Sequence, residues 1–277
     1  MLKELFFPVT GAPGDDAAIE AAAHIASAHG ARLVATVPVP AIGALAPPWA
    51  LPSATAVTEM IEDAEQEARR RVDALRHRLA RMDVQVEVRA EGDRFFDPPR
   101  ALARQARYAD LSFVAGPDPR AAATMHAYFS ALLFESGRPV LVVPPSADVS
   151  RRFRKMLVAW KPTREAARAV HDALAVFAPE SAEILTVDPV VSVLEHGAEP
   201  GADIGAHIAR HGVDVSVATR PSASIGVANT VLRHAAEIGA DVVVAGGYGH
   251  ARLREWALGG TTRELLDAMK TPVLFSH

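Results

Sequence analysis

The strongest constraint on the fold is an internal repeat, because the second half of this 277-residue sequence repeats the order of segments in the first. Each half opens on a short apolar segment and a polar turn, followed by an alanine-rich segment of helical character. Each half closes on the same tripeptide, Pro139-Val140-Leu141 and Pro272-Val273-Leu274. The other matched segments are Leu5–Thr10 with Met156–Trp160, Asp16–Ala28 with Arg164–Phe177, Arg32–Val39 with Ala182–Asp188, and Ala101–Ala115 with Val231–Gly246. A repeat on this scale predicts a tandem duplication.

Within each half, short runs of Val, Ile and Leu alternate with helical segments. Unbroken apolar runs are typical of parallel strands buried on both faces, and the alternation is typical of right-handed βαβ crossovers. Strands are expected at Leu5–Thr10, Arg32–Val39, Val84–Arg89, Leu111–Ala115, Val140–Val143, Met156–Trp160, Glu183–Val187, Asp214–Ala218, Asp241–Ala245 and Val273–Phe275. The sequence therefore predicts an α/β protein with two tandem, open, parallel, doubly wound (Rossmann-like) sheets of five strands each.

The domain boundary is expected at Pro144–Arg154, a segment with Pro-Pro and Ser-Arg-Arg composition. This boundary gives two domains, residues 1–145 and residues 153–277, and the chain is long enough for both to bury a core. The longest helix is expected at Val57–Arg81. We interpret its arginine-rich part as a solvent-exposed face in preference to an anion site.

Composition excludes several classes of function. With 29 Lys and Arg against 33 Asp and Glu, the chain lacks the basic balance of a nucleic-acid-binding protein, so no nucleic-acid partner is expected. The absence of cysteine excludes disulfides, thiolate nucleophiles and cysteine-based metal sites. The sequence shows no signal peptide and no uninterrupted apolar run of about 18 residues, so we expect a cytoplasmic protein with no membrane partner.

The segment most suggestive of chemistry is Ala245–Thr262, which follows a buried strand and leads into a helix. Glycines in such a place let a phosphate approach the backbone, and the start of a helix offers free N–H groups and partial positive charge. Thr261 and Glu264 have the spacing of a capping box, so Thr261 is expected to be the N-cap.

Each glycine of this segment also has a structural interpretation. Gly246 and Gly249 could be turn residues, and Gly259 and Gly260 could cap the end of a helix. The spacing of the whole set on one strand–loop–helix unit favours phosphate binding.

Two common nucleotide motifs are absent, and so is one hydrolase motif. The chain has no G-x-x-x-x-G-K-(S/T) sequence, which excludes a P-loop NTPase. A dinucleotide fingerprint follows the first strand of a unit, whereas these glycines follow the fourth. No G-x-S-x-G nucleophile elbow is present.

The arrangement resembles the universal stress protein family, whose pattern G-x2-G-x9-G-(S/T) follows the fourth strand of a five-stranded α/β fold. Gly246, Gly249 and Gly259 fall on the three glycine positions of that pattern. The tandem repeat, the closing Pro-Val-Leu segments and the alanine-rich first helix are similar to those of two-domain members. The resemblance covers essentially the whole chain.

The resemblance implies a ligand, namely ATP or another adenine nucleotide, with or without Mg²⁺. In the family the glycine loop holds the phosphates, the tip of the first strand meets the ribose side and the end of the second strand meets the adenine. Carried over to this sequence, the implied binding residues are Trp160, Lys161, Pro162, Val187, Gly246, Gly247, Gly249, His250, Gly259, Gly260 and Thr261.

The second half departs from the family pattern in two places. Gly260 replaces the hydroxyl residue that follows the last glycine, and Thr261 comes one position late. Lys161-Pro162-Thr163 stands where the family has an acidic residue followed by Gly-Ser. The lysine could pair with a phosphate or extend into solvent.

The first half departs further. It has Ala115-Gly116-Pro117-Asp118 at the matching position, where Asp118 would repel phosphate. One nucleotide per chain is therefore expected, in the second half.

The remaining polar pairs receive structural interpretations. His207 and His211 have i, i+4 spacing on an expected helix, but no third ligand accompanies them, so we expect surface histidines and no metal site. Asp15-Asp16 is read as the start of a helix, where acids favour the helix dipole. His126 and Tyr128 are expected to pack against the other half.

Taken together, these features favour a non-enzymatic protein that binds an adenine nucleotide and acts as a sensor or regulator in the stress response. An interaction scaffold that has lost nucleotide binding is the first alternative. A slow ATPase is the second, with Asp188 as the nearest acid for a metal ion. The two halves are expected to associate through their last strands, as the subunits of single-domain relatives do. A homodimer of the whole chain is left open.

Overall fold

The computed structural model describes residues 2–39, 53–91, 97–148, 152–191, 198–247 and 260–277. The first half comprises β1 (Glu4–Pro8), α1 (Asp15–His29), β2 (Arg32–Pro38), α3 (Ala54–Leu79), β3 (Gln85–Glu91), α4 (Pro98–Ala106), β4 (Leu111–Ala115), α5 (Ala122–Glu135) and β5 (Val140–Val143). The second half comprises β6 (Lys155–Ala159), α6 (Arg164–Phe177), β7 (Ser181–Val187), α7 (Ala202–Ala209), β8 (Asp214–Arg220), α8 (Gly226–Ile238), β9 (Val242–Gly246), α9 (Gly260–Ala268) and β10 (Val273–Ser276). All ten expected strands are confirmed, with small shifts at their ends, and so is the α/β class.

The strands form one ten-stranded sheet in the order β3-β2-β1-β4-β5-β10-β9-β6-β7-β8. Each half contributes five mutually parallel strands in the expected doubly wound order. The two sets join where β5 and β10 pair antiparallel, with Leu141 opposite Leu274. Both strands are fully buried, and pairing satisfies backbone groups that a buried free edge would leave without partners. The structure therefore differs from two separate sheets, and the carboxyl ends of the two sets point in opposite directions.

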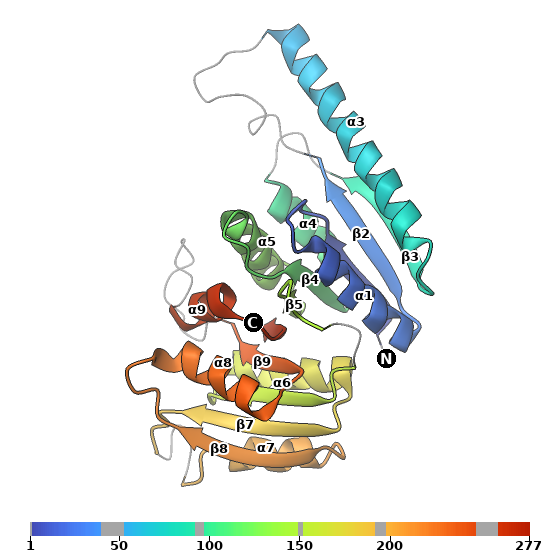
Figure 1. Ribbon diagram of the computed structural model, residues 1–277. Coiled ribbons are helices and arrows are strands. Elements are labelled where there is room, and N and C mark those ends of the chain that lie inside the picture. The colour runs from blue at the N-terminus through green and yellow to red at the C-terminus, as the bar shows by residue number, and fades with distance from the viewer. Residues whose placement is uncertain (1, 40–52, 92–96, 149–151, 192–197, 248–259) are drawn as a thin grey trace.

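Helices cover both faces of the sheet (Figure 1). The cluster on one face takes buried residues from α1, α3, α6 and α7. The cluster on the other face takes them from α4, α5, α8 and α9. This explains why the strands are continuous apolar runs, since neither face of the central strands meets water.

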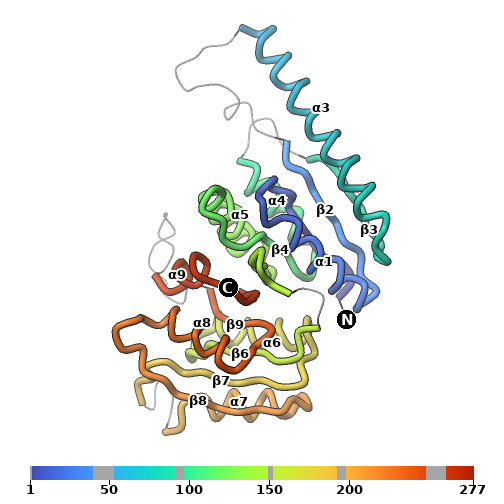
Figure 2. The backbone as a smooth tube through the Cα atoms, in the orientation of Figure 1, coloured from blue at the N-terminus to red at the C-terminus, as the bar shows by residue number. Residues whose placement is uncertain are grey.

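The C-terminal strand lies at the centre of the molecule, between the two halves (Figure 2). The ring of Phe129 on α5 meets the ring of Phe275 on β10 edge to face, with centroids 5.1 Å apart. Nearby, His126 Nε2 lies 2.7 Å from Asp267 Oδ1 on α9, so the expected contact of His126 with the other half is confirmed. Aromatic packing and a polar contact thus join the halves beside the β5–β10 pair.

The longest helix, α3, buries one narrow face against the sheet (Figure 1). Its buried residues recur at helical spacing: Ala68, Val72, Leu75 and Leu79. On the exposed face, Arg71 Nε pairs with Glu67 Oε1 one turn away at 3.0 Å. The expected solvent-exposed arginine face is confirmed. None of the helices in the described ranges has the length and hydropathy needed to span a bilayer.

Candidate functional site

The candidate site lies at the carboxyl ends of the second half's strands. In the order β10-β9-β6-β7-β8, the chain leaves β6 toward β7 and later returns to β9 on the other side of β6. Ligands of open α/β sheets bind outside the strand ends at such a switch point. Ala159 of β6 pairs with Ala245 of β9, so the next residues, Trp160 and Gly246, are neighbours at this edge. Residues implied by the family resemblance are therefore brought together.

The turn after β6 is held by its own backbone and by a helix cap. Trp160 is half-buried against the core, and its N–H donates to the Leu185 carbonyl at 2.8 Å. Lys161 and Pro162 are exposed. The Thr163 hydroxyl accepts from the Ala166 N–H at 3.3 Å and caps α6. Within the described part of the chain Lys161 forms no salt bridge, so its ammonium faces solvent at the switch point.

The end of β7 carries the implied adenine neighbour and an acid. Val187 is half-buried against the core cluster that includes α8. Asp188 follows with a φ of 46°. Its carboxylate accepts from the Ser222 N–H at 3.0 Å, and hydrogen bonds from the Ser222 side chain and backbone hold the pKa of Asp188 below its usual range. Asp188 thus pins the turn after β8, which gives this acid a structural role.

The first two glycines of the loop have clear packing roles. A Cβ at Gly246 would lie 2.6 Å from the backbone nitrogen of Ala166, at the start of α6. A Cβ at Gly247 would lie 2.7 Å from the Leu133 side chain on α5. The Gly247 N–H donates to the Ser276 carbonyl at 2.8 Å, so it is not free for a phosphate. Phosphate donors would have to come from residues that follow Gly247.

The helix α9, which follows the glycine-bearing segment, starts earlier than expected. Because α9 begins at Gly260, Thr261 lies inside the first turn, and the expectation that Thr261 is the N-cap is wrong. The alternative of Gly260 as the cap at the end of a helix is wrong for the same reason. Helix position is set by packing, and buried Thr262 and Leu265 hold the N-terminal part of α9 against the core. Three implied residues, Gly249, His250 and Gly259, lie outside the described residues.

The end of β4 in the first half has the same backbone arrangement as the end of β9, but it is followed by a shorter connection. The Gly116 N–H donates to the Val143 carbonyl at 2.6 Å, the counterpart of the bond from Gly247 to Ser276. The connection from β4 to α5 spans residues 116–121, whereas that from β9 to α9 spans residues 247–259. Asp118 accepts from Arg120 through its N–H and its guanidinium, and these bonds lower the pKa of Asp118. The first half thus has a shorter connection, whose acid is occupied by Arg120.

A buried acid in the first half was missed by sequence reasoning. Asp15 starts α1 as expected, yet it is only 8% exposed. It accepts from the Gly11 N–H at 2.7 Å and from the Thr10 hydroxyl at 2.9 Å. Burial raises the pKa of Asp15 to about 6, although these hydrogen bonds oppose the rise. The sequence pattern that could have indicated this is Thr10-Gly11, five and four residues before Asp15, because a glycine there lets the chain turn back toward the carboxylate.

The paired histidines belong to a small surface cluster. The ring of His207 meets the rings of His171 and His211 edge to face, each with centroids 5.0 Å apart. Burial, followed by the neighbouring His171, His211 and Arg210 charges, lowers the pKa of His207. Among the described residues no group of three potential ligands is arranged to hold a metal ion.

Solved structures share this tandem arrangement. A universal stress protein from Archaeoglobus fulgidus superposes with a TM-score of 0.70 and 15% identity, covering 98% of this chain and 94% of that one. A functionally unknown protein from Pseudomonas aeruginosa superposes with a TM-score of 0.55 and 15% identity, covering 99% and 92%. No protein-family model matches the sequence, and no curated protein matches it either. The likeness shows the fold, so the fold that the family resemblance implied is confirmed.

Proposed function

We propose that this chain, which has the tandem fold of the universal stress proteins, is a member of that family that binds one adenine nucleotide in its second half. It acts as a sensor or regulator in the stress response and performs no efficient chemistry. Its domains are residues 1–145 and 153–277, paired through β5 and β10 as an intramolecular counterpart of a dimer. The observation that carries the proposal is that the end of β9 lies next to the end of β6 at the switch point, and that thirteen residues, 247–259, several of them glycines, join β9 to α9.

The proposed roles follow the positions of the strand ends. Phosphates would contact the loop that contains Gly249 and Gly259 and the first turn of α9, whose backbone N–H groups lack partners within the helix. The sugar and its neighbouring phosphate would lie by Trp160-Lys161-Pro162, and the adenine by Val187. ATP is the preferred ligand, and ADP and AMP share the same contacts at the base and sugar.

Two alternatives remain in view because particular residues favour them. Gly246 and Gly247 already have packing roles, and Lys161-Pro162 replaces the family's acidic sugar contact, which favours a scaffold that has lost the nucleotide. A slow ATPase would need an acid to hold Mg²⁺. Asp188 already binds the Ser222 N–H, so this alternative is the weaker one.

The test is a pair of substitutions at matching positions of the two halves. Gly249→Val adds bulk where a phosphate would approach, and Asp118→Ala removes the acid from the counterpart loop. The parent and Asp118→Ala should both gain about 2.7 kcal/mol of stability at a nucleotide concentration of about one hundred times Kd, measured by thermal or urea unfolding. Gly249→Val should fold with the same stability as the parent in the absence of ligand and gain nothing from ATP.

Each contrary outcome identifies a different error. If Gly249→Val unfolds without ligand, this glycine is a structural turn residue. If the variant still binds ATP normally, the phosphate site is elsewhere. If the parent gains nothing from ATP, ADP or AMP, the scaffold is the better account. Release of phosphate over a long incubation, lost in Gly249→Val, would favour the slow ATPase.

A further inference from the structure

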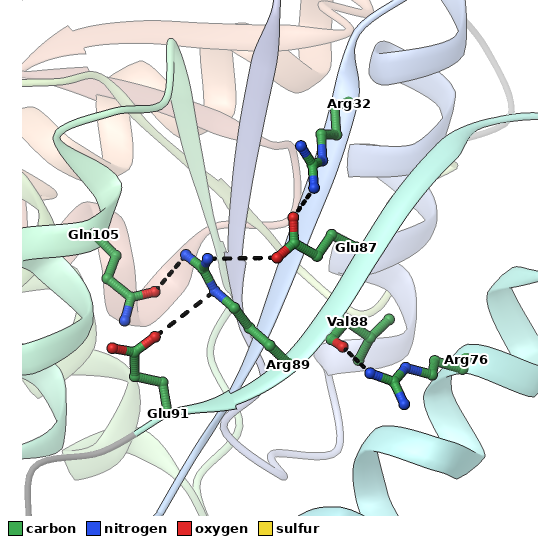
Figure 3. A network of polar contacts seen from close by, with 7 residues as sticks. All are labelled: Arg32, Arg76, Glu87, Val88, Arg89, Glu91 and Gln105. Carbon is green, nitrogen blue, oxygen red and sulfur yellow. Dashed lines mark hydrogen bonds and ion pairs between the residues drawn. The ribbon is translucent and has the colours of Figure 1, made fainter.

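The ten-stranded sheet has two edge strands, β3 in the first half and β8 in the second. Side chains hinder the pairing of β3 with another strand. The Val39 N–H donates to the Glu91 carbonyl, so alternate residues of β3 from Gln85 to Glu91 bond toward β2. The carbonyl of Val88, between them, points outward. Arg76 of α3 donates to that carbonyl at 2.8 Å (Figure 3).

Charged side chains protect β3 further. Glu87, Arg89 and Glu91 alternate along the strand, and Figure 3 shows Arg89 between the two glutamates. Arg89 also donates to Gln105 at 2.8 Å, and Glu87 pairs with Arg32. Charges and a covering helix are the usual means by which proteins stop an edge strand from pairing with another chain.

The opposite edge, β8, is less protected: the strand is uncharged between its two ends, and among the described residues no helix side chain bonds to its outward backbone groups. The Asp214 N–H donates to Glu180, and the Arg220 carbonyl accepts from Asp188, so the even-numbered residues bond toward β7. The N–H and C=O groups of residues 215, 217 and 219 therefore point away from the sheet. Among the described residues no strand lies beyond β8, and Arg220 Nη1 donates to the Thr219 carbonyl at 3.1 Å.

The side chains of β8 are uncharged except at its two ends. Between Asp214 and Arg220 the strand reads Val-Ser-Val-Ala-Thr, and its central residue, Val217, is 47% exposed. Neither Asp214 nor Arg220 forms a salt bridge with any described residue. A strand with opposite charges at its ends is complementary to its own antiparallel copy.

We propose that β8 is a self-association surface, on which a second copy of this chain pairs antiparallel about Val217. In this register Asp214 lies opposite Arg220 of the other copy on both sides of the axis. Residues 215 and 219 face one another, and Val217 faces Val217, so the outward groups exchange hydrogen bonds in pairs. The two half-exposed valines cover each other.

The charges select this orientation over the parallel one. A parallel pair would set Asp214 against Asp214 and Arg220 against Arg220, and like charges directly opposite one another destabilise a strand pair. Antiparallel joining also repeats what β5 and β10 do within the chain. The area of one strand pair is small, so a Kd in the micromolar range is expected. The inference does not depend on nucleotide binding.

The first experiment is sedimentation equilibrium of the full chain from low to high micromolar concentration, with Val217→Pro as the test variant. Proline removes an N–H that points away from β7 and is tolerated at such an edge position. The parent should dimerise and the variant should remain monomeric. Hydrogen exchange of the parent should slow with concentration at residues 215, 217 and 219. A monomeric parent, or a dimer unaffected by Val217→Pro, would overturn the proposal.

The second experiment keeps the test decisive if the proline variant fails to fold. Asp214→Arg should weaken dimerisation about tenfold or more, and adding Arg220→Asp to it should restore the dimer, because opposite charges face each other again. Glu62→Arg on exposed α3 changes the net charge equally and should leave the dimer unchanged. Failure of the double reversal to restore the dimer, or an equal loss in Glu62→Arg, contradicts the proposed register.

Discussion

The two halves of this molecule build the same sheet and differ where the fourth strand of each half ends. In both, a glycine N–H bonds to the last strand, from Gly116 to Val143 and from Gly247 to Ser276. The first half then enters its helix after a short connection with Asp118, and the second after a longer, glycine-bearing one. Duplication has preserved the backbone of the sheet, which packing requires, and has left the loops free to diverge. Loops at strand carboxyl ends carry function, so the halves need not share one.

The charged side chains at the carboxyl ends of the strands also differ between the two halves. In the first half, buried Asp15 and half-buried Asp118, which is paired with Arg120, lie near the ends of the first and fourth strands. In the second half the corresponding turn carries exposed Lys161. This difference is one reason why the proposed nucleotide site is assigned to the second half.

Gly246 and Gly247 are adjacent but have different surroundings, and substituting them should give the largest change in the free energy of unfolding. Ala115 occupies in the first half the position that Gly246 occupies in the second, where a Cβ would meet the backbone of α6. Gly246→Ala should lower the free energy of unfolding by about 3 kcal/mol, the upper end of the cost of overpacking. In Gly247→Ala the close contact is with the end of the Leu133 side chain, which can shift, and the Ser276 carbonyl is at an ordinary distance, so the cost should be about 1 kcal/mol or less. Urea unfolding measures both, and equal costs would show that the α6 contact is not rigid.

The buried acid of the first half, Asp15, predicts a pH dependence of stability. Since the pKa of Asp15 is raised from 3.8 to about 6, the native state holds its proton over a range where the unfolded chain releases it. This group therefore lowers stability as pH rises from about 4 to about 6, by about 2 to 3 kcal/mol in all. Asp15→Asn should remove that decline, because an amide does not titrate; its oxygen can still accept from the Gly11 N–H. A difference between parent and variant that stays constant from pH 4 to pH 7 would refute the raised pKa.

The smallest effect is expected at Lys161. If its ammonium meets a phosphate, Lys161→Ala should weaken ATP binding about tenfold, near the lower end for a charge-assisted contact because the side chain is exposed. Adenosine, which has no phosphate, should bind parent and variant alike. Equal weakening of both ligands, or of neither, places the lysine in solvent. Fluorescence titration of each ligand measures the ratio.

The fold was predictable because periodicity and burial act through many residues at once. Continuous apolar runs such as Leu111–Ala115 and Val140–Val143 coincide with β4 and β5. Single-residue geometry was harder to predict. The start of α9 at Gly260 depends on how Thr262 and Leu265 pack, and the burial of Asp15 depends on a chain reversal at Gly11, which has a φ of 78°. The packing role of Gly246 required the position of α6, which no local pattern supplies.

The most direct test of the contrast between the halves is a calorimetric titration of the full chain with ATP, repeated with ADP and AMP. The account predicts saturation at about one nucleotide per chain, with the site lost in Gly249→Val and retained in Asp118→Ala. Two equivalent sites per chain would contradict it, because the first half would then bind a nucleotide despite its short loop and Asp118. No binding of any of the three nucleotides would contradict it as well.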